Sequence, residues 1–138
     1  MNILVVCTGN ACRSQMLHGF LKQYLGFNVY SAGIETHGVN PIAIHVMKEI
    51  NIDISSHTSN LIHEYSDVTF DYLITVCDRA NEFCPIFSNN IKKIHQSFDD
   101  PGSCLGTENQ ILAEFRRIRE QINLFSNQLH QALMLPAS

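Results

Sequence analysis

Cys7-Thr8-Gly9-Asn10-Ala11-Cys12-Arg13-Ser14 joins two segments of different periodicity. The apolar run Ile3-Leu4-Val5-Val6 precedes it, and its β-branched residues are typical of a buried strand. Apolar residues then repeat at helical spacing from Met16 to Tyr24. The segment is therefore predicted to be a turn from a strand into a helix.

A turn of this kind collects backbone N–H groups in a small concavity that favours an anion. Gly9 allows a tight turn, Asn10 can hold the loop or adopt a positive φ, and the planar Arg13 guanidinium matches two oxygens of a tetrahedral oxyanion. N–H dipoles and a guanidinium also stabilise a thiolate, so we expect Cys7 to be a nucleophile. The predicted oxyanion site consists of Thr8, Gly9, Asn10, Ala11, Cys12, Arg13 and Ser14, the last of which can hydrogen-bond the Cys7 sulfur.

This loop resembles that of the low-molecular-weight tyrosine phosphatases. It equally resembles the loop of the thioredoxin-coupled arsenate reductases, which are built on the same fold. The choice between the two families depends on the rest of the chain.

Composition limits the class of protein. The chain has 138 residues, of which 45% are hydrophobic and 16% charged, so one globular domain over residues 1–138 is expected. The net charge of -4 argues against nucleic acid or an anionic membrane as partner. No stretch has the length of a membrane span and no cleavage site is visible, so a cytoplasmic protein is expected. Five cysteines, an odd number, indicate reactive thiols rather than a disulfide framework.

The remaining pattern predicts strands alternating with helices. The first helix should end near Gly26, Asn40 should cap a helix beginning at Pro41, and Thr107 and Gln110 have the spacing of a capping box. Further strands are predicted at 28–32, 71–76 and 92–95, and a short helix at 61–65. The fold class is therefore α/β, a three-layer sandwich in which helices flank a four-stranded parallel sheet. Ligands bind at the carboxyl ends of such strands, where Cys7 and Cys77 should lie together.

Cys77 and Cys84 are seven positions apart. In a helix their Cα atoms would be about 10 Å apart, whereas a disulfide needs roughly 4.4–6.8 Å. A bond between them would therefore require the intervening segment to loop out. From spacing alone, the alternative that Cys77 ends a buried strand and Cys84 packs under a turn is equally open.

Further segments carry a resemblance that decides between these alternatives. They are similar to the thioredoxin-coupled arsenate reductases over nearly the whole chain. The matching segments are 30–41, 53–55, Thr75-Val76-Cys77, Asn81-Glu82-Phe83-Cys84-Pro85 and Phe98-Asp99-Asp100-Pro101.

The resemblance implies a mechanism. Cys7 would attack arsenate, and Asp100 would protonate the leaving oxygen. From the residues alone Asp100 would cap the turn before Pro101, and Asp99 is a rival for the acid role. Cys77 would then form a transient Cys7–Cys77 disulfide, and Cys84 would convert it into a Cys77–Cys84 disulfide for thioredoxin to reduce. The implied partners are arsenate and thioredoxin, with a monomeric protein and without a metal or organic cofactor.

Family members often carry a potassium ion beside the anion loop, bound partly by Asn10 and by an acidic residue of the first helix. His18 stands at the matching helix position, which argues against the ion, although Asn10, Ser31 and Asp53 could contribute. The seven histidines show no metal-ligand spacing. Cys12 is expected to be buried, with oxidative pairing to Cys7 as the alternative, and Cys104 is expected to face solvent.

Two other functions are compatible with the same loop. A low-molecular-weight protein tyrosine phosphatase would use Cys7, Arg13 and Asp100 with water as the acceptor, and Cys77 and Cys84 would be dispensable. A non-catalytic thiol sensor would oxidise without turnover. Within the reductase hypothesis, a small thiol could replace thioredoxin, and weak activity on aryl phosphates is expected.

Overall fold

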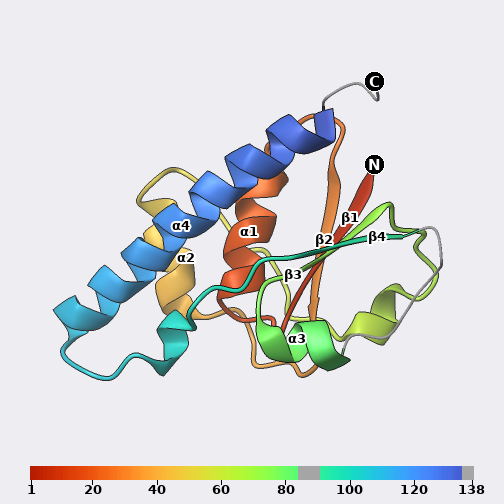
Figure 1. Ribbon diagram of the computed structural model, residues 1–138. Helices are drawn as coiled ribbons and strands as arrows, with labels where there is room; N and C mark the ends of the chain where they lie inside the picture. Colours follow the sequence, from red (N-terminus) through yellow and green to blue (C-terminus); the bar gives the residue numbers. More distant parts are fainter. Residues whose placement is uncertain (84–90, 135–138) are drawn as a thin grey trace.

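The computed structural model describes residues 1–83 and 91–134 (Figure 1). Four strands form one parallel sheet in the order β2-β1-β3-β4. Cys84 and the rest of residues 84–90 lie outside the described residues. The predicted four-stranded parallel sheet is confirmed, with strands β1 (Asn2–Cys7), β2 (Asn28–Gly33), β3 (Tyr72–Thr75) and β4 (Lys92–His95).

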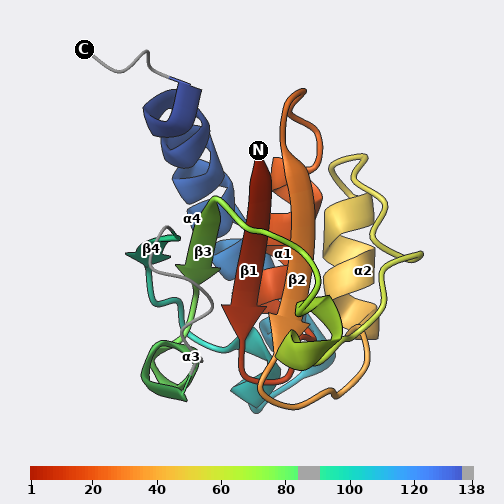
Figure 2. The ribbon, with the colours of Figure 1, turned by 90° about the vertical axis from the view of Figure 1, so that its right-hand side faces the viewer.

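Helices cover one face of the sheet, and an irregular segment covers the other (Figure 2). The covering helices are α1 (Arg13–Leu21), α2 (Pro41–Lys48) and α4 (Glu108–Met134). The opposite face is crossed by the segment containing η1 (Ile62–Tyr65), where Tyr30 of β2 contacts the rings of Tyr65 and Phe70. The three-layer α/β sandwich is thus confirmed. The layer that contains η1 is much thinner than the layer of helices α1, α2 and α4.

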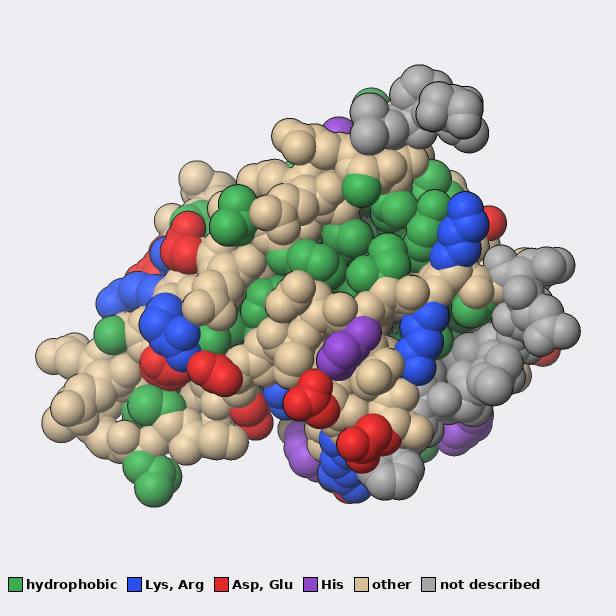
Figure 3. Space-filling model, viewed as in Figure 1, with side chains coloured by type: hydrophobic (Ala, Val, Ile, Leu, Met, Phe, Trp, Pro, Cys, Tyr) green, Lys and Arg blue, Asp and Glu red, His purple; other side chains and the backbone are tan. Residues whose placement is uncertain are grey.

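The core lies around β1. Residues Ile3 to Val6 are completely buried, as the apolar run predicts. Met16 and Leu17 of α1 pack behind them, and Phe115 of α4 is 1% exposed. Between α4 and β4, hydrophobic side chains reach the molecular surface (Figure 3). Among the described residues, no helix is both long and apolar enough to cross a membrane.

Two predicted helix starts have the expected caps. Asn40 Oδ1 accepts a hydrogen bond from the Ile42 N–H at 2.8 Å, so α2 begins at Pro41. Gln110 Oε1 accepts from the Thr107 N–H at 2.8 Å, and Thr107 Oγ1 accepts from the Gln110 N–H at 3.2 Å. This is the predicted capping box of α4.

The end of the first helix was predicted too far along the chain. α1 ends at Leu21 instead of near Gly26. The Tyr24 ring stacks on His130 of α4 with centroids 3.8 Å apart, and Gly26 has a φ of 90°. The chain leaves the helix early because Tyr24 packs against α4 and the backbone turns at Gly26.

Two short elements lie at the carboxyl ends of the strands, where the site is expected (Figure 1). α3 (Asp78–Phe83) follows β3 directly after Cys77. η2 (Pro101–Ser103) follows β4, and its first turn is capped by Asp100, whose Oδ1 accepts from the Gly102 N–H at 2.9 Å.

Candidate active site

The loop between β1 and α1 is held at its centre by Asn10. Asn10 is completely buried and has a φ of 50°, in the left-handed region that asparagine tolerates better than most residues. Its side-chain oxygen accepts a hydrogen bond from the Asn60 N–H at 2.9 Å. Its side-chain amide donates to Ser14 Oγ at 2.8 Å. The loop is therefore fixed in advance of any ligand.

A neighbouring segment, residues 34–40, binds the outer side of this loop. Its N–H groups donate to the carbonyl groups of Cys7, Thr8, Gly9 and Ala11 at 2.9 to 3.3 Å. Because the C=O and N–H of a trans peptide point in opposite directions, the N–H groups of the same peptide units point into the loop. This is the cradle of N–H groups that the sequence predicts for an anion.

Gly33 makes this close approach possible. A Cβ atom at Gly33 would lie 2.3 Å from the Glu35 carbonyl oxygen and 2.8 Å from the Thr8 carbonyl oxygen. Both atoms belong to the backbone and cannot turn aside, so a side chain here would push the loop out of place.

A cavity of about 300 Å³ opens on the loop. Cys7 lines it, is 2% exposed, and has its Sγ 2.9 Å from Ser14 Oγ. Ser14 is completely buried, so its hydroxyl is fixed on the sulfur. The lining residues are Cys7, Thr8, Gly9, Ala11, Cys12, Arg13, His37, Gly38, Val39, Asn40, Pro41, Asp100 and Gly102.

Arg13 begins α1 and lines the same cavity. Its Nη1 donates to the Phe98 carbonyl at 3.1 Å, and its Nη2 lies 3.8 Å from Asp100 Oδ2. The side chain is only 12% exposed. The segment after β4 therefore orients the guanidinium toward the loop, and a planar fork in this place can bind two oxygens of an oxyanion.

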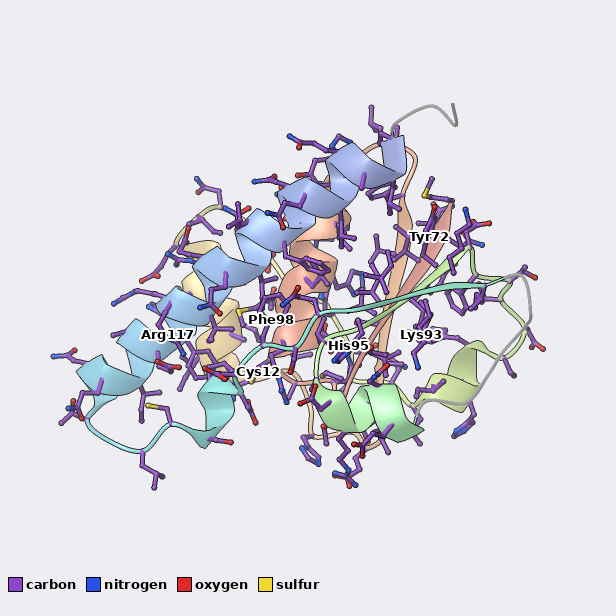
Figure 4. The ribbon with its side chains drawn as sticks, viewed as in Figure 1. Cys12, Tyr72, Lys93, His95, Phe98 and Arg117 are labelled. Atoms are coloured by element: carbon purple, nitrogen blue, oxygen red, sulfur yellow. The ribbon has the colours of Figure 1, made fainter. Side chains whose placement is uncertain are left out.

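Asp100 and Asp99 have different surroundings. Asp100 lines the cavity, whereas Asp99 Oδ2 lies 3.1 Å from the guanidinium of Arg117 on α4 (Figure 4). Asp100 also caps η2, which confirms the capping role expected from the residues, while its role as the acid stays a prediction. Of the two carboxyl groups, only that of Asp100 is placed to exchange a proton with a ligand in the cavity.

Cys77 lies beside the loop on the neighbouring strand. It is 4% exposed, and its Sγ is 3.2 Å from Thr8 Oγ1. β1 and β3 are adjacent and parallel, and this brings residues 69 positions apart into contact. The expectation that Cys7 and Cys77 share one edge of the sheet is confirmed.

The other cysteines are placed differently. Cys12 lines the cavity but is buried, and burial together with the charges of Asp100 and Cys7 raises its pKa to about 12. It therefore stays a neutral thiol at physiological pH. Cys104 is partly exposed and is not among the lining residues. Cys84 is outside the described residues, so its place relative to Cys77 stays a prediction.

Comparison with known families agrees with this geometry. A family model described as low molecular weight phosphotyrosine protein phosphatase matches residues 2–135. The chain belongs to this family.

Several members of this phosphatase family resemble the chain closely. The arsenate reductase of Staphylococcus aureus is 52% identical over 124 residues, which make up 88% of this chain and 90% of that protein. A solved arsenate reductase in the phosphate binding state has a TM-score of 0.75 and 33% identity, covering 93% of this chain and 95% of that one. The YwlE arginine phosphatase of Geobacillus stearothermophilus has a TM-score of 0.75 and 26% identity, covering 96% and 92%.

A hydrogen-bonded chain in this family member leads from Lys22 to the anion loop. The Lys22 ammonium, which can only donate, lies 2.9 Å from His57 Nε2. His57 therefore carries its proton on Nδ1, which donates to Gln15 Oε1 at 2.9 Å. Gln15 Nε2 in turn donates to the Asn10 carbonyl at 3.1 Å. Sequence reasoning missed Lys22, Gln15 and His57, because partners 35 and 42 residues apart leave no local signal.

The residues considered for a potassium site take part in other contacts. His18 Nδ1 lies 2.8 Å from Ser31 Oγ, and the His18 ring stacks on His57 with centroids 4.1 Å apart. Burial, with the neighbouring His57 and Lys22, lowers the pKa of His18 to about 3, and burial with Lys22 lowers that of His57 to about 4. The Asp53 carboxylate accepts from the Ser55 N–H and hydroxyl. The described residues contain no cluster of three His, Cys, Asp or Glu side chains able to hold a metal ion.

His37 is a further lining residue that sequence reasoning did not assign. Its ring lies against Gly9, where a Cβ atom would be 2.4 Å from His37 Nδ1. Its Nε2 lies 2.8 Å from Glu35 Oε2, and the other oxygen of Glu35 lies 2.9 Å from the guanidinium of Arg79 in α3. The segment 30–41 carried the family resemblance, but nothing in its composition indicated this place at the cavity mouth.

Proposed function

We propose that this protein reduces arsenate to arsenite by a relay of three thiols and that thioredoxin restores the thiols. The observation that carries the proposal is the second buried thiol beside the anion loop, Cys77, with its sulfur 3.2 Å from Thr8 Oγ1. A hydrolytic phosphatase has no chemical need for it. The 52% identity to an arsenate reductase over most of the chain supports the same activity.

The first step is attack on arsenic. Arsenate binds in the cradle of N–H groups, with the Arg13 guanidinium on two of its oxygens. The Cys7 thiolate attacks arsenic, and Asp100 gives a proton to the oxygen that leaves as water. The product is a Cys7–arsenic(V) adduct. Ser14, 2.9 Å from the sulfur, stabilises the thiolate before attack and again when it later becomes the leaving group.

The next two steps transfer the electrons. The Cys77 thiolate attacks Cys7 Sγ, the sulfur–arsenic bond breaks, and its electron pair stays on arsenic, which leaves as arsenite. A Cys7–Cys77 disulfide remains. The Cys84 thiolate then attacks Cys77 Sγ, which frees Cys7 and gives a Cys77–Cys84 disulfide. The dithiol of thioredoxin supplies the two electrons that reduce it.

Phosphotyrosine hydrolysis is the alternative, and the cavity lining disfavours it. Among the described residues that line the cavity, none is Phe, Tyr or Trp. A phosphotyrosine ring would therefore lack an aromatic wall, whereas a small tetrahedral oxyanion needs none. Weak hydrolysis of aryl phosphates is still expected, because Cys7, Arg13 and Asp100 suffice for it.

We also propose that the relay needs neither an organic cofactor nor a resident potassium ion. A cation bound by Ser31 would face the imidazole of His18, whose Nδ1 lies 2.8 Å from Ser31 Oγ, and the ammonium of Lys22 contacts the neighbouring ring of His57. The residues present do not fit the ion. Turnover should accordingly be the same in potassium and in choline buffers. A marked loss in choline would contradict the proposal.

The compartment follows from the same chemistry. Free thiols at Cys7 and Cys77 need a reducing compartment, so we propose the cytoplasm. We also propose that the protein acts as a monomer.

The test follows NADPH oxidation and arsenite formation with thioredoxin, thioredoxin reductase and arsenate. The wild type should turn over continuously, whereas reduced Cys84→Ser should form one equivalent of arsenite from its own thiols, stop with a Cys7–Cys77 disulfide and sustain no NADPH oxidation. Cys104→Ser, which removes a cysteine outside the cavity, is the matched control and should behave as the wild type. If arsenate causes no NADPH oxidation while aryl phosphates are hydrolysed rapidly, the proposal of a reductase is wrong and the protein is a phosphatase. Oxidation of the cysteines without any turnover would indicate a thiol sensor.

A further inference from the structure

The imidazole of His95 contacts the residues on both sides of Cys77 in the sequence. Its side chain lies near α3 (Figure 4). His95 ends β4, next to β3 in the sheet. Its Nδ1 lies 2.7 Å from Thr75 Oγ1, and its Nε2 lies 3.0 Å from Asp78 Oδ1. Thr75 is two residues before Cys77 and Asp78 is the residue after it. The His95 ring therefore connects the end of β3 to the beginning of α3, and Cys77 lies between these two points in the sequence.

The hydrogen-bonding roles of this bridge follow from its chemistry. A carboxylate only accepts, so His95 Nε2 carries a proton and donates it to Asp78. In the neutral ring Nδ1 then accepts from the Thr75 hydroxyl, which is completely buried. The ring is thus oriented from inside the protein and presents its outer nitrogen to the first residue of α3.

Other contacts fix the segment before Cys77 better than the one after it. The backbone N–H groups of Gln96 and Phe98 donate to the carbonyl groups of Thr75 and Val76 at 2.9 and 3.1 Å. α3 has only six residues, too few for a helix that is stable without tertiary contacts. The Asp78 side chain is 80% exposed, so its contact with His95 depends on the orientation that the buried Thr75 hydroxyl gives to the ring.

Two further polar contacts hold α3. Lys93, also on β4, donates from Nζ to the Asn81 carbonyl at 3.1 Å (Figure 4). Arg79 lies 2.9 Å from Glu35 Oε1. Ala80 is the buried apolar contact among the described side chains of α3. Together with the His95–Asp78 contact, these bonds tie α3 to β4 and to the segment that follows β2.

We infer that His95 and Asp78 are positioning residues for the second step of the proposed relay. Through Thr75 and Asp78, the His95 ring fixes the backbone on both sides of Cys77 and so holds its thiol beside Thr8. Displacement of a reacting group by about 1 Å can lower a rate about a hundredfold, so a loose bridge would slow attack on Cys7. The inference rests on the proposed function, although the placement of the thiol can be measured without arsenate.

The experiment compares Asp78→Ala, Asp78→Asn, His95→Gln and the double variant Asp78→Ala/His95→Gln with the wild type. Asn keeps an acceptor for His95 Nε2, whereas Ala removes it. Lys92→Gln changes the residue three positions before His95 on the same strand, outside the bridge, and is the matched control. Three rates are measured: alkylation of Cys77 by iodoacetamide without arsenate, located by mass spectrometry; arsenate-dependent turnover; and p-nitrophenyl phosphate hydrolysis.

In Asp78→Ala and His95→Gln we expect Cys77 alkylation to rise several-fold and kcat with arsenate to fall about tenfold, with KM unchanged. Hydrolysis of p-nitrophenyl phosphate, which needs Cys7 but not Cys77, should be unchanged. Asp78→Asn and Lys92→Gln should resemble the wild type. The double variant should be no worse than His95→Gln alone, because both changes break one bridge.

Unchanged alkylation and turnover in both single variants would overturn the inference, and so would additive losses in the double variant. If the wild type shows no arsenate turnover while alkylation responds as expected, the proposed function fails and the bridge stands. If turnover falls but alkylation of Cys77 does not change, the bridge does not place the thiol.

Discussion

Two partly buried histidines, His18 and His57, should make the protein less stable in mild acid. His18 has a pKa of about 3 in the folded protein and His57 one of about 4, whereas both lie near 6.5 in an unfolded chain. Between these values only the unfolded chain binds the protons. The free energy of unfolding is therefore highest above about pH 6.5, where both rings are neutral in the folded and the unfolded chain. It decreases as the pH falls toward the pKa values of the two rings in the folded protein.

The magnitude can be worked out for His18, which is mostly buried. A proton bound only by the unfolded chain lowers the free energy of unfolding by about 1.4 kcal/mol per pH unit. From pH 7 to pH 5, His18 alone should remove about 2 kcal/mol from the roughly 5–15 kcal/mol that a domain has. His57, which is partly exposed, adds a loss of the same sign. Glu49, with a pKa of about 2, contributes only at lower pH.

The assay is urea unfolding of the wild type and of His18→Asn at both pH values. Asn does not titrate, and its amide can keep a hydrogen bond to Ser31. The drop between pH 7 and pH 5 should therefore be smaller in the variant by about 2 kcal/mol, whatever its stability at pH 7. Equal drops in the two proteins would refute the reasoning. So would NMR titration of the His18 ring with a midpoint above pH 5.

Other predictions concern single side chains. Asp100→Asn should lower arsenate turnover about a hundredfold and Asp99→Asn only slightly, since Asp99 pairs with α4; equal losses would remove the acid role from Asp100. Asn40→Ala removes the cap of α2 and should cost about 1 kcal/mol in urea unfolding, a value near zero being inconsistent with the capping bond. Gly33→Ala places a Cβ atom 2.3 Å from a backbone oxygen and should cost about 1–3 kcal/mol; an unchanged melting temperature would show that the backbone yields freely.

Local signals in the sequence predict much of this fold. β4 has the predicted bounds Lys92–His95, and the caps at Asn40 and Thr107 are as expected, because capping and alternation depend on residues a few positions apart. The oxyanion site at residues 7–14 could be predicted for the same reason, since cysteine, glycine and arginine lie within eight residues.

What the sequence could not predict depends on contacts between distant residues. Nothing near Tyr24 shows that its ring will stack on His130, so the end of α1 was placed too late. The bond from His57 to Gln15 joins residues 42 positions apart, and only the folded chain reveals it. Asp99 and Asp100 are neighbours in sequence, and it is Arg117 on α4 that distinguishes them.

The parallel pairing of β1 with β3 has a consequence for placing a second thiol beside the loop that follows β1. Neighbouring parallel strands are about 4.8 Å apart and end at the same edge of the sheet. A residue just beyond one strand is therefore always a near neighbour of the loop that follows the other. One substitution to cysteine at position 77 would place an electron donor next to an existing nucleophile without any change of topology. If the proposed relay is right, the end of β3 is the position at which a thiol could be added to a hydrolytic site of this strand order, which makes it a target for protein design.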